Sequence, residues 1–329
     1  MATNPTISLD SAVDLLTSAL QDPAKTNVCA VGLGLAADRI NIALEGCTTI
    51  AARIKIVKAY PQLLRAGIKF LTFNQPLPGH VAMVNHLNTC RCDLWCSTAK
   101  RNHQPSRPRP DGQVKVHNID LLFDAVIAVS NCLILALSDR TQHKFDTGNV
   151  DNGEKHWPQG PDDLLPKGPK DAVLGLELWV ANVSYGDVIF KLAGCLALFY
   201  DPFAREVLQY LHFRFTLARP FGHLEHAIKF YNEGDPSPLA RTLFFQYSVT
   251  TIFDFFDNLI SCDTVRFNIL LMARGREVGA SPVLARLTTI SSTLPPQEWR
   301  KTCRLVHFMG AYINADMDPT TGVRLVKFE

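Results

Sequence analysis

Apolar residues recur at helical spacing along most of this chain, and this periodicity restricts it to a mainly α-helical fold. In residues 8–21, for example, Val13, Leu16 and Leu20 lie on one helical face, behind a serine suited to cap the helix. Only in residues 322–328 do apolar and polar side chains alternate as they would in a short β-strand. The other predicted helices occupy 30–71, with breaks at Gly46 and Pro61, then 118–137, 170–182, 186–200, 204–218, 223–232 and 239–258.

The helical segments fall into two groups. Residues 141–169 contain four glycines and four prolines without apolar periodicity, and this composition is typical of a linker. We therefore predict an N-terminal helical lobe over 1–140 and a C-terminal helical bundle over 170–329 that ends in a basic tail. Residues 74–115 are rich in Pro, His, Asn and Arg and predict a loop, and the basic Pro-rich stretch that overlaps its end is 97–117.

The composition excludes several classes of protein. Hydrophobic residues make up 47% of the 329 residues and charged residues 19%, which predicts a folded chain. The nine cysteines are scattered rather than spaced like a disulfide framework, and the first residues do not resemble a signal peptide, so we expect a reduced, intracellular protein. No apolar stretch is long enough for a membrane span. With a net charge of +2, any attraction to nucleic acid must come from local clusters of cations.

The sequence lacks the usual marks of an enzyme. Gly32-Leu33-Gly34 fits a dinucleotide-binding turn, but Arg53 and Lys55 stand where that fold needs an acidic residue. Close helix packing at the glycines is the favoured interpretation, and a nucleotide-dependent enzyme is the least favoured alternative. No signature of hydrolases, zincins or P-loop proteins occurs. We expect no catalytic residues and no cofactor.

Metal binding receives little support. Cys90, Cys92 and Cys96, with His86 and His103 nearby, offer soft ligands in a loop. Their spacing matches none of the usual zinc patterns, so buried or incidental thiols are favoured. The acid pairs Asp162-Asp163 and Asp316/Asp318 lie in Pro/Gly-rich turns, where solvated carboxylates are the ordinary case.

One segment is unusual. Residues 251–257 read Thr-Ile-Phe-Asp-Phe-Phe-Asp, with three aromatic rings and two acids near the end of an apolar helix. Helical spacing allows the phenyl rings to pack inward while Asp254 lies at the edge of the buried surface. An acid in that position requires a cationic partner.

This segment resembles the signature of the coat proteins of flexuous filamentous RNA viruses, the potexvirus-like flexiviruses. In that family an arginine precedes the motif at a similar distance, and here Arg219 precedes Phe253 by 34 positions. Residues 187–201 and 231–238 are also similar to family segments, so the resemblance covers roughly 170–276. Asn258 replaces a glycine that often follows the motif, and 201–204 replaces a serine-containing stretch.

The resemblance implies a viral capsid subunit that polymerises with itself into a flexuous helical filament. It implies that single-stranded RNA is packaged without sequence readout and without DNA recognition, and it places the protein in the virion and the host-cell cytoplasm. Asp254 would orient Arg219 by a charge-assisted hydrogen bond. The expected RNA contacts are Arg219, Arg214, His223, Lys229 and Arg241, and the expected groove-orienting motif is Phe253, Asp254, Phe255, Phe256 and Asp257.

A helical membrane-surface protein of the peroxin-11 type is the main alternative. Residues 51–71 are amphipathic, and a helix of this kind can lie in a lipid interface. Its basic residues are Arg53, Lys55, Lys58, Arg65 and Lys69. A membrane partner is expected only under this alternative.

Overall fold

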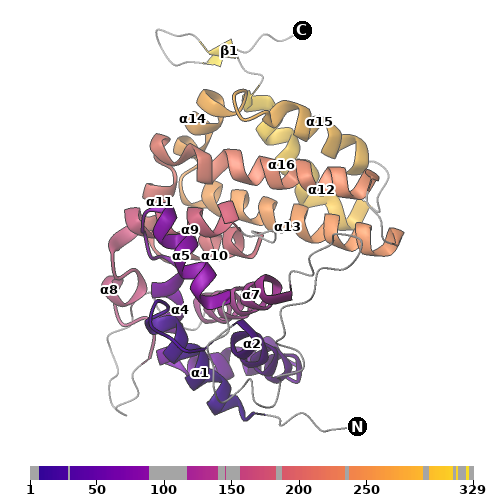
Figure 1. Cartoon of the computed structure of the whole chain (residues 1–329). Coiled ribbons are helices and arrows are strands. Elements are labelled where there is room, and N and C mark those ends of the chain that lie inside the picture. The colour runs from indigo at the N-terminus through magenta and orange to yellow at the C-terminus, as the bar shows by residue number, and fades with distance from the viewer. Residues whose placement is uncertain are drawn as a thin grey trace. The chain divides into compact units, whose positions relative to one another are not determined.

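The computed structural model is mainly helical, which confirms the predicted fold class (Figure 1). The structure describes residues 7–28, 30–88, 117–139, 145, 156–182, 187–233, 237–291, 296–313, 316–317 and 324–325. The chain divides into two compact units, and each is considered by itself below. We call residues 1–185 the N-terminal unit and residues 186–329 the C-terminal unit.

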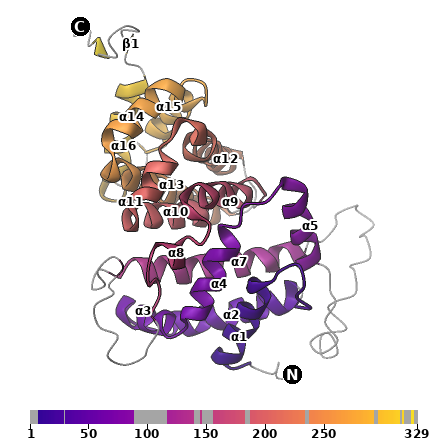
Figure 2. The ribbon, with the colours of Figure 1, turned by 90° about the vertical axis from the view of Figure 1, so that its left-hand side faces the viewer.

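The N-terminal unit is an assembly of packed helices. In Figure 2, α4 crosses in front of α7, and both also pack on the earlier helices, α4 on α1 and α7 on α2. The described helices of this unit are α1 (Leu9–Gln21), α2 (Ala30–Glu45), α3 (Ile50–Lys58), α4 (Pro61–Leu71), α5 (Leu77–Asn88), α7 (His117–Leu137), α8 (Pro161–Leu164) and α9 (Gly168–Asn182).

Local sequence explains where α1 and α4 begin. The Ser8 hydroxyl accepts a hydrogen bond from the Ser11 amide and caps α1, while Pro61 occupies the first position of α4, where its missing N–H costs nothing. Just before α4, the Tyr60 hydroxyl donates to Asp10 Oδ1 at 2.6 Å and ties the two helix starts together.

Glycines allow the helices of this unit to approach closely. Gly32 and Gly34 lie inside α2 rather than at a strand-to-helix turn, so the geometry of a dinucleotide-binding turn is not formed. A Cβ at Gly34 would lie 2.8 Å from Leu121 Cδ2, and a Cβ at Gly67 would lie 2.4 Å from Val129 Cγ1. The structure therefore agrees with the interpretation of these glycines as packing positions.

The predicted loop over 74–115 was wrong at its start, because α5 begins at Leu77. Pro78 lies in the first turn, where proline is tolerated, and His80, Met83 and Leu87 bury one face. The basic Pro-rich part of that loop lies outside the described residues, except for residue 117 at the start of α7.

The predicted boundary between the lobes also requires correction, because the chain divides after Tyr185 and not within 141–169. Trp157 and Leu164 of the predicted linker are almost completely buried, and Asp163 accepts two hydrogen bonds from Arg65 of α4. The helix α9 belongs to the same unit, since its Trp179 ring packs 4.9 Å from that of Phe70. Apolar burial outweighs the local Pro/Gly composition.

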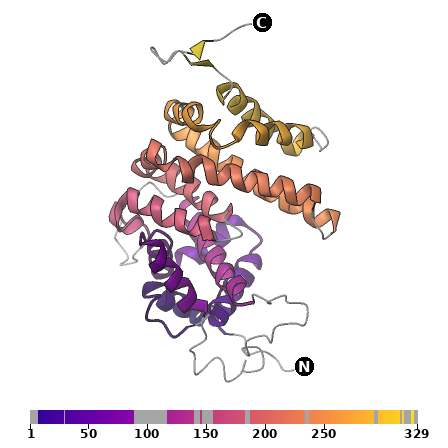
Figure 3. The same ribbon diagram turned by 45° about the horizontal axis from the view of Figure 1, so that its top comes forward.

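The C-terminal unit packs its helices in the order α10, α13, α12, α15 and α16, a succession that can be followed in Figures 1 and 3. Its described elements are α10 (Asp187–Phe199), α11 (Asp201–Val207), the 3-10 helix η1 (Tyr210–His212), the π-helix η2 (Arg214–Ala218), α12 (Arg219–Glu233), α13 (Pro238–Cys262), α14 (Thr264–Arg274), α15 (Ala280–Ser291), α16 (Pro296–Ile313), and the paired strands β1 (Asp316–Met317) and β2 (Arg324–Leu325).

The predicted helix over 204–218 is interrupted in the structure, where α11, η1 and η2 follow one another. Buried polar contacts explain the interruption. The Thr216 hydroxyl donates a hydrogen bond to Val207 O at 2.6 Å. His212 is 1% exposed, and its Nε2 atom lies 2.9 Å from Glu206 Oε1. These contacts satisfy polar groups that a continuous helix would not bring together.

We expect different effects from two glycine substitutions in the C-terminal unit. A Cβ at Gly194 of α10 would lie 2.8 Å from Asn258 Nδ2, which can rotate away, and 3.4 Å from Phe255 Cα, which cannot, so Gly194→Ala should give no stabilisation and cost up to about 1 kcal/mol. Gly222 lies exposed inside α12 with open space around it, and Gly222→Ala should stabilise by about 1 kcal/mol. Urea denaturation followed by circular dichroism measures both, and equal effects would contradict the close approach of α10 and α13.

We also expect an alkaline effect from Tyr60. Its hydrogen bond to Asp10, together with burial, raises the pKa of Tyr60 from 10.0 to about 12. Because the folded state favours the neutral phenol, the stabilisation is present below pH 10.0 and is lost as the pH rises towards about 12. The difference in unfolding free energy between the wild type and Tyr60→Phe should shrink over this range in urea titrations. A constant difference would show that the contact does not persist.

Candidate nucleic-acid interface

An aromatic cluster lies at the centre of the C-terminal unit. Phe190 of α10, Phe215 of η2 and Phe255 of α13 are 0% exposed. The Phe190 ring centroid lies 5.6 Å from that of Phe215 and 5.4 Å from that of Phe255, and the third pair is 6.1 Å apart. Such spacing is favourable for aromatic pairs. Three segments that are distant in the sequence therefore pack against one another through these three rings.

The other rings of the motif extend this cluster. Phe256 lies 5.5 Å from Phe221 of α12 and 5.8 Å from Phe267 of α14, and Phe253 packs edge-on against Phe256 at 6.0 Å. All three phenyl rings of the motif are buried, as the helical spacing predicted. Through Phe255 and Phe256, the motif thus packs α13 against α10, η2, α12 and α14.

The acids of the motif lie at the edge of the buried surface. Asp254 and Asp257 are both partly exposed. Burial raises the pKa of the Cys195 thiol to about 11, the charge of Lys191 opposes this shift, and the charge of Asp254 adds to it. Asp254 therefore lies near α10. Its predicted hydrogen bond with Arg219 stays a prediction.

Three of the five predicted RNA contacts are exposed. Arg214 lies on η2, Arg219 begins α12, and Lys229 lies three turns farther along that helix. At about 3.6 residues per turn, Arg219, His226 and Lys229 fall on one side of α12. All three are exposed, so this side presents the cations Arg219 and Lys229 to solvent.

The other two predicted contacts point into the unit. His223 Nδ1 lies 3.3 Å from Asp187 Oδ1, and its ring packs edge-on against Phe190 at 5.5 Å. Arg241 is partly buried and donates from Nη1 to Tyr231 O at 3.2 Å, which links α13 to the end of α12. Both side chains thus make internal contacts, and an RNA role for either stays a prediction.

The buried carboxylate of Asp187 was not among the predicted site residues. It begins α10, and its Oδ2 accepts a hydrogen bond from the Ser248 hydroxyl at 2.6 Å. Asp187 therefore joins α10, α12 and α13 through Ser248 and His223. No sequence signal identifies this pairing, because Asp187 and Ser248 are 61 positions apart.

The remaining sequence candidates lie elsewhere. Cys90, Cys92 and Cys96 are outside the described residues, as are the side chains of Asp316 and Asp318. Asp163 is paired with Arg65, so one predicted solvated acid is instead a packing contact. Within the described residues, no group of His, Cys, Asp and Glu side chains is arranged to hold a metal ion.

The amphipathic segment of the membrane alternative is two helices, α3 and α4. The apolar side of α4 is buried in the N-terminal unit, including Leu64 and Ile68, and Lys58 and Arg65 are paired with Asp139 and Asp163. In the described part of the chain, none of the helices combines the length and hydropathy that a membrane span requires.

Comparisons of this chain with protein-family profiles, with curated proteins and with solved structures found no match.

We expect Ser248 and Asp187 to be energetically coupled. Ser248→Ala leaves a buried carboxylate oxygen without its donor and should cost about 1–3 kcal/mol. Once Asp187→Ala has removed the carboxylate, Ser248→Ala should cost at least about 0.5 kcal/mol less, since the serine hydroxyl has then already lost its acceptor. A double-mutant cycle in urea measures this coupling. Ser261→Ala, at an exposed position of the same helix, serves as the control.

Proposed function

We propose that this chain is a capsid subunit that polymerises into a flexuous helical filament and packages single-stranded RNA without sequence readout. The observation that carries the proposal is the convergence of Phe190, Phe215 and Phe255 in one buried cluster. Phe190 and Phe255 come from segments whose sequences resemble the coat-protein family, and Phe215 lies four positions before the matched Arg219. Their contact supports the view that the resemblance reflects a shared core.

The exposed cations provide the chemistry for RNA. Arg214, Arg219 and Lys229 follow one another over η2 and α12, and each is exposed. Point charges along a surface attract phosphates whatever the base sequence, as packaging of a whole genome requires. The net charge of the chain is only +2, so this attraction is local and should weaken steeply with salt.

An exposed apolar stripe supports self-association. Leu239, Leu243 and Tyr247 recur every four residues on α13 and are 68%, 56% and 49% exposed. A row of large apolar side chains on one face is unfavourable in water and marks a contact surface. In the proposed filament this stripe would be covered by a neighbouring subunit. The protein would then reside in the virion and in the host-cell cytoplasm.

Electron microscopy provides the direct test. The full chain is expressed, its absorbance ratio is measured to detect nucleic acid that purifies with it, and particles are imaged in negative stain. Flexible rods or rings with nuclease-sensitive RNA are expected. A nucleic-acid-free monomer that stays monomeric after addition of RNA would overturn the proposal.

We expect Arg219→Ala to lower RNA affinity without unfolding the chain, because the side chain is exposed. Removal of one phosphate contact should reduce the slope of log K against log salt by roughly 0.7, the value for a single strand. Fluorescence anisotropy with a labelled oligonucleotide measures this slope. Arg304→Ala removes an equal charge from α16, outside the proposed RNA face, and should leave binding nearly unchanged.

A further inference from the structure

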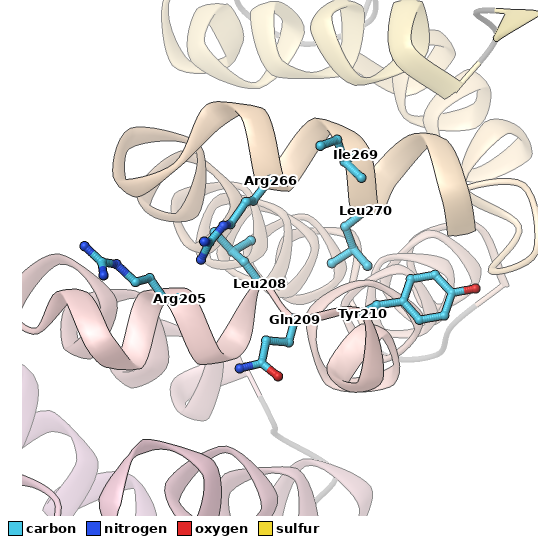
Figure 4. A pocket seen from close by; sticks show the side chains of 7 residues that line it. All are labelled: Arg205, Leu208, Gln209, Tyr210, Arg266, Ile269 and Leu270. Carbon is cyan, nitrogen blue, oxygen red and sulfur yellow. The ribbon is translucent and has the colours of Figure 1, made fainter. Parts of the chain in front are cut away.

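A cleft of about 410 Å³ opens on the C-terminal unit between α14 and the turn after α11 (Figure 4). Its floor is apolar, since Leu208 is 5% exposed and Leu270 is 2% exposed. Figure 4 shows two groups of side chains around it, Arg205, Leu208, Gln209 and Tyr210 on one side and Arg266, Ile269 and Leu270 of α14 on the other. None of the cations in the predicted RNA groove lines this cleft.

Tyr210 is held in a fixed place at the rim of the cleft. The guanidinium carbon of Arg274 lies 4.3 Å from the Tyr210 ring centroid and 4.5 Å from that of Phe213. Arg274 is in turn paired with Glu277. A cation above a ring restrains it, yet Tyr210 remains 55% exposed. The ring therefore presents a flat, pre-positioned surface.

Two arginines give the cleft a positive charge. Arg205 is exposed at the end of α11, and Arg266 has 51% of its side chain exposed. Asp263 lies 3.3 Å from Arg266 Nε and restrains this side chain, while it offsets part of its charge. The residues that line the cleft include no acid.

We propose that this cleft binds one nucleotide of the packaged RNA, with the base stacked on Tyr210 and the phosphate held by Arg205 and Arg266. The inference rests on the proposed function, because it names the place where that function would seat a base. Its chemistry is a stacking surface beside guanidinium groups, the combination that binds single strands without reading their sequence. The volume lies in the range of about 300–1,000 Å³ that is typical of small-ligand sites.

Binding of a labelled fifteen-nucleotide oligouridine to the full chain tests the stacking role. Tyr210→Ala should weaken binding about tenfold, since it removes one stacked base, while Tyr210→Phe should bind like the wild type. Tyr312→Ala removes a partly exposed tyrosine of α16, outside the cleft and outside the α13 stripe, and is the matched control. The same oligonucleotide with 4-thiouridine should crosslink to the peptide that contains Tyr210.

The arginines are tested by charge removal. Arg205→Gln with Arg266→Gln should reduce the slope of log K against log salt by about 1.4, the value for two contacts to a single strand. Lys55→Gln with Lys69→Gln removes the same charge from exposed positions of the N-terminal unit and should change the slope less. Circular dichroism and urea midpoints confirm that each variant is folded.

The outcomes separate the two proposals. If the wild type binds oligouridine and Arg219→Ala weakens it, but Tyr210→Ala and the Arg205/Arg266 variant bind like the wild type, the cleft inference is overturned and the capsid proposal stands. If the wild type binds no oligouridine at any salt concentration, both are overturned. Displacement of the oligonucleotide by polyglutamate as readily as by RNA would also overturn the nucleotide site.

Discussion

The burial of Phe190, Phe215 and Phe255 against one another is the contact on which the C-terminal unit depends. It joins α10, η2 and α13, and Phe256 extends it to α12 and α14. Fully burying each ring contributes roughly 1.5–3 kcal/mol, more than a typical net hydrogen bond. Because the rings fill the interior, the charged residues of the same segments are carried to its edge and surface. The position of the cations on η2 and α12 is thus a consequence of aromatic packing.

Polar contacts then refine an arrangement that apolar burial creates. Asp187 is buried between Ser248 and His223, and Thr216 bonds across the turn between α11 and η2. Such groups are costly to bury without partners, so they favour one register of the helices over others. The interruption of the helix at η1 also brings Tyr210 to the surface beside α14.

The proposed RNA face and the proposed nucleotide cleft would contribute different kinds of interaction to RNA binding. Exposed cations such as Arg219 supply attraction that is long-range and insensitive to sequence. The cleft supplies short-range contacts, in which a ring fixed by Arg274 meets a base. The exposed stripe of α13 is a separate surface, available for contact between subunits.

The sequence by itself determined the helical class, most helix positions before residue 259 and the inward packing of the motif rings, since these follow from periodicity, caps and helix breakers. It also named five RNA contacts, and three of them, Arg214, Arg219 and Lys229, are exposed. The tertiary structure decided what periodicity cannot express. It placed α5 and the 156–165 segment in the N-terminal unit, turned His223 towards Asp187, and assembled the cleft around Tyr210. These features depend on contacts between residues far apart in the chain, and such contacts leave no local pattern.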